Sequence, residues 1–159
     1  MENLVATLRG FDHVGVTVQD LDRSLAFYHD LLGLEVLRRR DRFKAEYVQK
    51  LVGFPDAEMS VAMLAIPNGG KVELVQYHEP FGKQIDAAPC DRGGVHFALL
   101  VEDIHGLKAA LEASGVAFVS EPQCSPSGPT QGTYFVYCRD PDGAIVELIQ
   151  PARQSAPLA

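Results

Sequence analysis

The chain has 159 residues, of which 47% are hydrophobic and 22% charged, so it can bury a core of ordinary size as one compact unit. A net charge of −7, with basic residues clustered only at 38–42, disfavours a nucleic-acid or anionic-membrane partner. No apolar run reaches the ~18 residues that a membrane span needs, and three widely spaced cysteines fit a reducing compartment, so we expect a soluble, cytoplasmic protein.

The chain opens with a predicted strand and helix. Residues 11–18 alternate valines with other side chains, which predicts a strand and places His13 on the face opposite the valines. Asp20 can cap a helix over residues 21–32, and Gly33 supplies its stop.

Further strands complete this first half. Residues 34–40 predict a second strand, and 45–51 a short helix in the least clear part of the chain. Residues 59–66 and 71–77 predict a hairpin across a glycine-containing turn. The composition then shifts to proline, glycine and charged residues, which indicates a linker over residues 79–92.

The second half repeats this order. A strand over 94–101 carries His96, and Asp103 can cap a helix over 104–114. Residues 116–120 predict the next strand. The remaining segments are a loop and two strands of a closing hairpin: 121–132, 133–139 and 144–150.

Two short sequences support an internal repeat. Residues 67–76 and 141–150 share Pro, Gly, Val, Glu, Leu and Gln in register, and the first His and the helix cap of each half are both seven residues apart. We therefore predict an α+β fold of two tandem βαβββ modules joined into one domain over residues 9–151. The predicted parts are module 1 (about 9–78), the linker (about 79–92), module 2 (about 93–151) and tails at 1–8 and 152–159; the extra residues of module 1 fall near 41–58.

Each module opens with a histidine and ends with a glutamate: His13 and Glu73, then His96 and Glu147. Alone, a strand histidine is more often a hydrogen-bonded core residue, and a strand glutamate more often an exposed one. If the His96 strand is buried on both faces, however, its imidazole needs a partner. Together the four form a mixed N/O donor set that suits Zn, Ni, Co, Mn or Fe(II), with positions left for water or substrate.

Five segments resemble the vicinal oxygen chelate superfamily, which includes glyoxalase I, methylmalonyl-CoA epimerase, extradiol dioxygenases and bleomycin- and fosfomycin-resistance proteins. The resemblance covers roughly residues 9–151 and rests on His13-Val-Gly-Val, Ala26-Phe-Tyr with Leu32-Gly-Leu, Val72-Glu-Leu, His96-Phe-Ala-Leu and Asp140-Pro-Asp-Gly-Ala-Ile-Val-Glu-Leu.

The resemblance implies a fold in which curved mixed sheets enclose a metal cleft, commonly in a homodimer. It implies that His13, Glu73, His96 and Glu147 hold one divalent metal ion. The expected activity is a lyase, isomerase or epimerase that transfers a proton on a small substrate with vicinal oxygens, through a metal-bound enediolate. Either Glu73 or Glu147 is the expected catalytic base, and the sequence does not choose between them.

Two alternatives remain open. An Fe(II) extradiol-type dioxygenase needs a triad with open positions, which a fourth ligand at Glu73 would crowd. A non-catalytic drug-binding resistance protein is the other alternative, although such members tend to lose the ligands. Thr17 stands where glyoxalase I enzymes carry an arginine, and their Asn-bearing segment is replaced at 76–78, which disfavours glutathione. Methylmalonyl-CoA epimerases carry Gln in place of Glu73.

Other residues have two interpretations each. The arginines at 38–40 and 42 are either a solvated strand end or an anchor for an anionic substrate group. Residues 128–132 are either a mobile lid or an ordinary loop. His78 lines the cleft mouth or lies exposed in a loop, and His29 and His105 are expected on helix surfaces. Aromatic residues that either contact substrate or pack in the protein are Tyr77, Phe81, Tyr134 and Tyr137.

Overall fold

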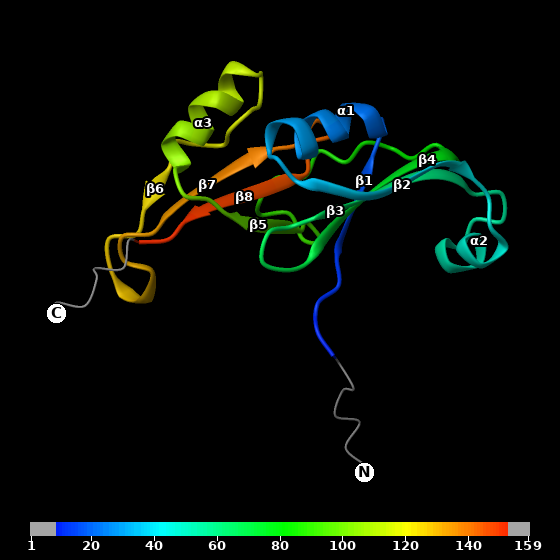
Figure 1. Ribbon diagram of the computed structural model, residues 1–159, viewed down its shortest axis with the longest axis horizontal. Helices are drawn as coiled ribbons and strands as arrows, with labels where there is room; N and C mark the ends of the chain where they lie inside the picture. The colour runs from blue at the N-terminus through cyan, green and yellow to red at the C-terminus, as the bar shows by residue number, and fades with distance from the viewer. Residues whose placement is uncertain (1–8, 153–159) are drawn as a thin grey trace, which may run out of the picture.

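The structure is a computed structural model that describes residues 9–152, so the predicted tails lie outside the described residues apart from Ala152. Two four-stranded sheets lie next to each other, and two of the three α-helices lie on the same side of them (Figure 1). The first module contains β1 (Val14–Val18), α1 (Leu21–Leu25), the π-helical turn η1 (Ala26–Leu31), β2 (Glu35–Phe43), α2 (Glu46–Val52), β3 (Glu58–Ala65) and β4 (Lys71–Glu79). The second contains β5 (His96–Leu100), α3 (Ile104–Ala113), β6 (Gln123–Cys124), the 3₁₀ turn η2 (Gly128–Thr130), β7 (Tyr134–Arg139) and β8 (Ile145–Gln150).

The two sheets have the same topology. Their strand orders are β1-β4-β3-β2 and β5-β8-β7-β6, and in each sheet the first strand of the module runs parallel to the last. The prediction of two tandem βαβββ modules in an α+β fold is therefore confirmed. The extra residues of module 1 form α2, inside the stretch where an insertion was expected.

One face of each sheet is covered by α1 or α3, and the opposite face is open except in module 1, where α2 packs near Val61, Val75 and Tyr77. Alternate side chains of the strands point under α1 and α3 and form a single apolar core that both modules share. In module 1 these are Val16, Val18, Ala62, Leu64, Val72 and Leu74; in module 2 they are Leu99, Val136, Cys138, Val146 and Leu148. The residues between them, including all four predicted ligands, therefore lie on the open face.

The recurring glutamine of the repeat has a structural role that the sequence did not reveal. In each module its side-chain oxygen accepts a hydrogen bond from the first backbone N–H of the helix on that sheet. Gln76 accepts from Leu21 of α1 at 3.0 Å, and Gln150 accepts from Ile104 of α3 at 2.8 Å. Asp20 and Asp103 cap the same helices, as predicted. Each helix start is therefore fixed both from its own cap and from the last strand of its sheet.

A buried polar contact ties the modules together. The Tyr28 hydroxyl donates to a carboxylate oxygen of Asp140 at 2.9 Å, and both side chains are buried. Burial raises the pKa of Asp140, while the Tyr28 hydrogen bond and the backbone N–H groups of Ala144 and Asp142 oppose that rise. Asp142 in turn accepts from the backbone N–H of Gln19 at 3.0 Å, so the turn before β8 is held against module 1.

The first helix departs from the prediction of one α-helix over residues 21–32. From Ala26 onward the chain forms a π-helical turn, in which the N–H of Leu32 donates to the carbonyl of Phe27 at 3.0 Å. Gly33 follows with φ +74, the left-handed conformation in which helices commonly end.

The strand predicted over residues 116–120 is wrong. This segment makes one isolated bridge to β7, between Phe118 and Cys138, and Pro122, which has no N–H to donate, follows shortly after it. The short strand β6 instead lies at 123–124, inside the segment predicted to be a loop. Among residues 9–152, no helix is both long and apolar enough to cross a membrane.

Candidate metal-binding site

The first predicted pair, His13 and Glu73, meets on the open face of module 1. His13 directly precedes β1, and the β1–β4 register sets Gly15 opposite Glu73. The imidazole Nε2 lies 3.4 Å from the Glu73 Oε2, and the Glu73 side chain is 26% exposed. The fold therefore brings together one nitrogen and one carboxylate donor that are 60 residues apart in the chain.

A second carboxylate orients His13. The ring Nδ1 donates to Asp12 Oδ2 at 2.8 Å, and Lys71 Nζ binds the other Asp12 oxygen at 2.6 Å. Lys71 first, and then His13, hold the pKa of Asp12 below its usual value, so Asp12 remains an acceptor. Because Asp12 binds Nδ1, Nε2 is the ring nitrogen that faces Glu73, and a carboxylate on the second ring nitrogen is common among metal-binding histidines.

The second pair, His96 and Glu147, repeats this contact in module 2. The β5–β8 register sets Ala98 opposite Glu147, and the distance from His96 Nε2 to Glu147 Oε2 is again 3.4 Å. Glu147 is more enclosed, at 14% exposed, and the Tyr137 ring centroid lies 5.2 Å from that of His96. The His96 strand is not buried on both faces: on its open face Leu100 is 76% exposed.

The donors of each pair suit a cation. Glu73 and Glu147 are partly enclosed, and within residues 9–152 neither has a lysine or arginine partner, only its histidine. A divalent ion would neutralise such carboxylates, and imidazole with carboxylate suits Zn, Ni, Co, Mn or Fe(II). Between residues 9 and 152, however, no three His, Cys, Asp or Glu side chains of one chain come together as a metal site. The four predicted ligands are thus found as two separate pairs.

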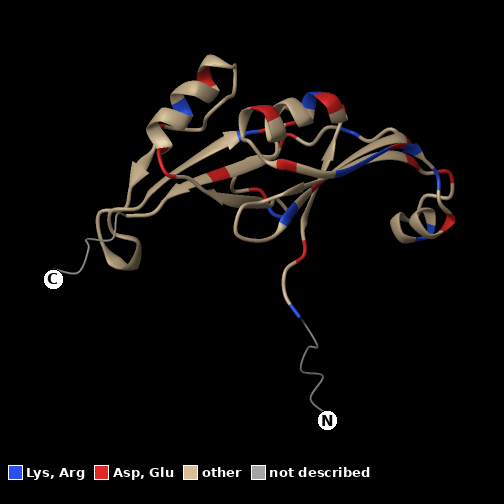
Figure 2. Ribbon diagram, in the orientation of Figure 1, with Lys and Arg blue, Asp and Glu red and all other residues tan. Residues whose placement is uncertain are grey.

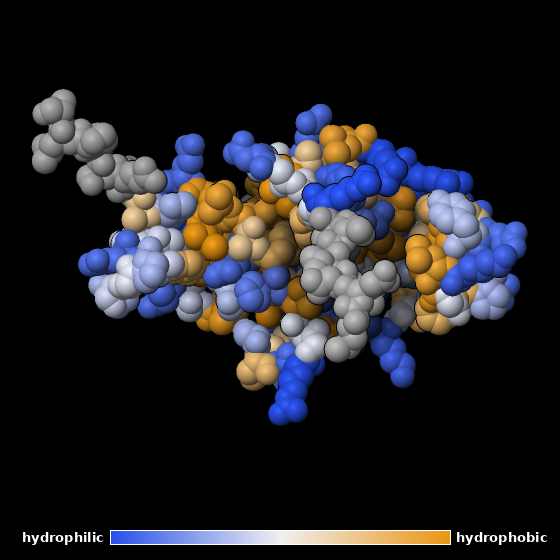
Figure 3. All heavy atoms as spheres, turned by 90° about the horizontal axis from the view of Figure 1, so that it is seen from below, coloured by the Kyte–Doolittle hydropathy of each residue, from blue (hydrophilic) through white to orange (hydrophobic). Residues whose placement is uncertain are grey.

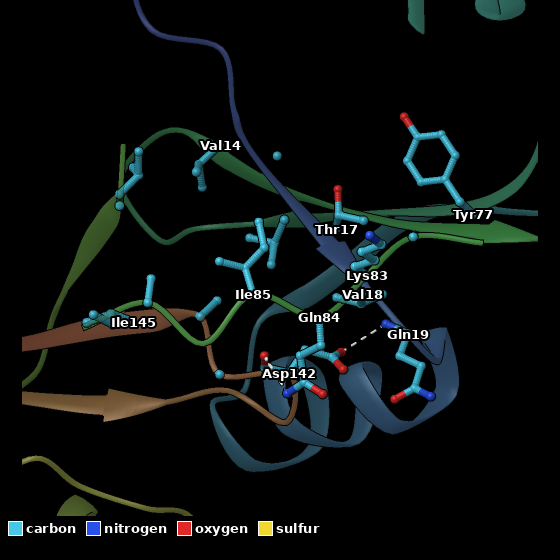
Figure 4. Close-up of a pocket in the computed structure, with 18 of the residues that line it drawn as sticks. Val14, Thr17, Val18, Gln19, Tyr77, Lys83, Gln84, Ile85, Asp142 and Ile145 are labelled. Atoms are coloured by element: carbon cyan, nitrogen blue, oxygen red, sulfur yellow. Dashed lines mark hydrogen bonds between the residues drawn. The ribbon is translucent and has the colours of Figure 1, made fainter. Parts of the chain in front are cut away.

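A pocket of about 620 Å³ lies where β1 meets the linker and the start of β8. Figure 4 shows side chains from these three segments converging on it, among them Thr17, Ile85 and Ile145. None of the four predicted ligands lines this pocket, but Gly15, which is opposite Glu73 in the sheet, does. Its size is typical of small-molecule sites.

The open side of the molecule also carries exposed apolar residues. Viewed from the side away from α1 and α3, apolar patches interrupt the hydrophilic surface (Figure 3). The exposed large apolar side chains include Phe11, Val95 and Leu100, which lie close in sequence to His13 and His96.

Several other predicted residues lie away from the two pairs. His78 is hydrogen-bonded to the buried Ser60 at 2.8 Å, and His29 to the carbonyl of Leu34, also at 2.8 Å. His105 packs edge-on against Tyr134. Tyr77 and Phe81 line the pocket, and residues 128–130 form the 3₁₀ turn η2.

Sequence reasoning missed Asp12 and Lys71. An acidic residue directly before a candidate ligand histidine was an available signal, because a carboxylate commonly binds the second ring nitrogen of such histidines. Lys71 could not be placed beside Asp12 without the β1–β4 pairing.

Comparisons with known proteins agree with this architecture. The family model described as Glyoxalase/Bleomycin resistance protein/Dioxygenase superfamily matches residues 10–148. A probable lactoylglutathione lyase of Vibrio parahaemolyticus is 31% identical over 148 residues, which are 92% of this chain and 94% of the relative. A 2-epi-5-epi-valiolone epimerase of Actinomyces sp. is 31% identical over 140 residues, covering 86% of this chain and 76% of the relative. A glyoxalase family protein of Bacillus cereus shares the fold, with a TM-score of 0.81 at 23% identity over 93% of this chain and 97% of that one.

Proposed function

Because the chain belongs to the glyoxalase/bleomycin resistance protein/dioxygenase superfamily, we propose that it is a divalent-metal-dependent lyase, isomerase or epimerase. It acts by proton transfer on a small substrate that carries two adjacent oxygens. The observation that supports this most strongly is the recurrence of one His–Glu contact, at 3.4 Å, in equivalent places of both modules. A structural role alone would not require the same two donors twice.

The proposed metal ligands are His13, Glu73, His96 and Glu147. Asp12 binds the Nδ1 of His13 and so aims Nε2 at Glu73, which positions that donor for a cation. A bound divalent cation would supply Lewis-acid stabilisation of the negative charge that develops on the substrate oxygens.

The proton is moved by a glutamate. Glu73 or Glu147 takes it from the carbon next to the carbonyl and returns it to a neighbouring carbon or to the opposite face of the same carbon. Both carboxylates are partly shielded from water, 26% and 14% exposed, which limits exchange of the abstracted proton with solvent but does not abolish it. The same step serves isomerisation, epimerisation and lyase chemistry.

We further propose that the four-ligand site forms between two copies of the chain in a homodimer. One chain offers two separate donor pairs, and exposed apolar residues such as Phe11 and Leu100 lie near them and would be covered by a second copy. In that arrangement the module 1 pair of one copy meets the module 2 pair of the other.

Mixing two variants tests the shared site. One carries His13→Ala with Glu73→Ala, and the other His96→Ala with Glu147→Ala. If the site is shared, co-refolded heterodimers regain one intact site and one bound metal ion, although neither variant binds metal alone. If each site is built within one chain, the mixture binds no more metal than the separate variants, which contradicts the shared arrangement.

The reaction class is tested in D₂O. The metal-loaded protein is supplied with the glutathione–methylglyoxal hemithioacetal and, separately, with α-hydroxy ketones, and the products are followed by NMR. We expect solvent deuterium at the carbon beside the carbonyl. Oxygen uptake with a catechol would instead indicate a dioxygenase, and tight drug binding without turnover or metal would indicate a sequestering protein. The hemithioacetal tests directly whether the protein uses glutathione. Thr17 and residues 76–78 disfavour that use.

A further inference from the structure

Strand β2 carries four arginines, which appear as a blue run along its ribbon in Figure 2. Arg39 points to the helix-covered side, where its Nη1 binds Asp22 of α1 at 2.5 Å. Arg42 binds Glu58 at 2.9 Å. These two arginines are therefore paired with carboxylates and need no further partner.

Arg38 and Arg40 lie on the open face. The strand registers set Arg38 opposite Met63, and Met63 opposite Glu73, so these three side chains form one row across the sheet. Arg40 is opposite Val61 in the adjacent row. Both arginines are exposed, and within residues 9–152 neither forms an ion pair with a carboxylate.

The row sets the distance between the arginines and the proposed metal ligand. Two strand spacings separate the backbones of Arg38 and Glu73, which is about 10 Å. The side chains between them are apolar: Met63 is 5% exposed, and Val61 packs against the cluster around α2. The Arg40 guanidinium also lies 4.0 Å from the Phe43 ring centroid, a cation–π contact that holds it on this face.

The second module shows that the repeated scaffold does not require these arginines. There Tyr137 is opposite Glu147, in the place of Met63. The next segment brings Val119 alongside Tyr137, where its N–H donates to the Tyr137 carbonyl at 2.9 Å. The position matching Arg38 is thus apolar, and the basic edge belongs to module 1 alone.

We propose that Arg38 and Arg40 bind an anionic group, a carboxylate or a phosphate, at the end of the substrate remote from its vicinal oxygens. This inference rests on the proposed function, because it takes Glu73 as the position of the chelating end. The substrate class is then a molecule with adjacent oxygens at one end, an anion at the other, and a spacer that bridges the distance from Glu73 to Arg38. Arginine suits this task since its planar guanidinium binds both oxygens of such a group at once.

Matched hydroxamates test the proposal, because a hydroxamate offers two adjacent oxygens to a metal. Suberic acid monohydroxamate ends in a carboxylate, octanohydroxamic acid has the same chain length and ends in a methyl group, and a third probe ends in a phosphonate. Their Kd values are measured by calorimetry on the metal-loaded, full-length protein. We expect one of the anionic probes to bind about tenfold more tightly than the methyl probe. Whichever anion binds more tightly identifies the source as a carboxylate or a phosphate.

A matched set of variants locates the effect. Arg38→Gln with Arg40→Gln should abolish the preference for the anionic probe and leave the Kd of the methyl probe unchanged. Arg39→Gln removes one charge from the same strand on the other face, and should keep the preference. Raising the NaCl concentration on the wild-type protein should shrink the preference, which tests the inference even if a variant fails to fold.

The two proposals fail in different ways. Equal binding of all three probes to wild-type protein overturns the arginine anchor and leaves the metal site standing. Failure of every hydroxamate to bind, in protein that also takes up no divalent metal, overturns the proposed function and the anchor with it. A preference that survives the double variant places the anion elsewhere and also overturns the anchor.

Discussion

The two His–Glu pairs have the same donor contact in different surroundings. Both have 3.4 Å between Nε2 and Oε2, but His13 is oriented by Asp12 and Lys71, whereas His96 packs against the ring of Tyr137. Within residues 9–152 His96 has no carboxylate partner other than Glu147. Glu147 is in turn more enclosed than Glu73, at 14% against 26% exposed.

Comparison of the two modules separates the features that recur in both from those found in only one. The contact between donors and the glutamine bond to each helix start recur in both modules, while the groups around the donors do not. We infer that the pairs serve one shared task as ligands, and that the remaining tasks, orientation of a ligand and binding of the substrate, are divided between the modules.

The largest expected effect is on the rate of substrate proton exchange, and it should differ between variants of the two glutamates. Glu73→Gln and Glu147→Gln each keep the size of the side chain but remove its basicity. The variant that lacks the catalytic base should exchange the substrate proton about 10²–10⁴-fold more slowly, and the other should lose less. Deuterium exchange at equal metal occupancy measures this. Equal losses in both variants would contradict the assignment of a single base.

Tyr28→Phe tests the buried hydrogen bond between Tyr28 of module 1 and Asp140 of module 2. Loss of a hydrogen bond to a buried carboxylate should cost about 2 kcal/mol of unfolding free energy at neutral pH. Burial already raises the pKa of Asp140, and the missing hydroxyl raises it further, so folding favours the protonated acid. The loss should therefore grow as the pH rises above the ordinary value of 3.8, and be smallest below it.

Urea denaturation at several pH values measures this dependence. A loss that does not change with pH would contradict the role assigned to the Asp140 charge. Asp140→Asn in the same background should flatten the pH profile.

Asp12→Asn tests the orientation that only module 1 has. A neutral amide holds the His13 ring less firmly, so metal affinity should fall about tenfold. Asp41→Asn, another exposed aspartate of module 1 that contacts Arg39, is the control and should leave the metal affinity unchanged. Equal metal affinity in Asp12→Asn and wild type would contradict the role of Asp12 in orienting His13.

The smallest expected effects are losses of stability that should be equal in the two modules. Gln76→Ala and Gln150→Ala each remove one acceptor from a helix start and should each cost about 1 kcal/mol of stability. Gln131→Ala on the loop after η2 is the control, with no expected change. A cost confined to one module would break the equivalence of the two helix starts.

Much of this architecture could be predicted from alternation of apolar residues and from the repeat. The strands, helix caps and His–Glu positions follow from local patterns, and the structure brings each His to its Glu across one pair of strands. The predicted strand at 116–120 failed because β-branched and aromatic content cannot reveal that a segment leaves its neighbour after one bridge. The Tyr28–Asp140 contact joins residues 112 apart, and no local pattern encodes it. The proposed assembly of the four residues into one site depends on how the two pairs meet, and local sequence patterns do not encode that.

The metal content of the purified protein is the most direct test of the central claim. Protein made without chelator or affinity metal is analysed for bound elements beside His13→Ala, Glu73→Ala, His96→Ala and Glu147→Ala. We predict one divalent ion for each complete set of four ligands in the wild type, and strong loss in all four variants, whichever module is changed. A wild-type protein that takes up no Zn, Ni, Co, Mn or Fe(II), or variants that keep the full metal content, would contradict the account.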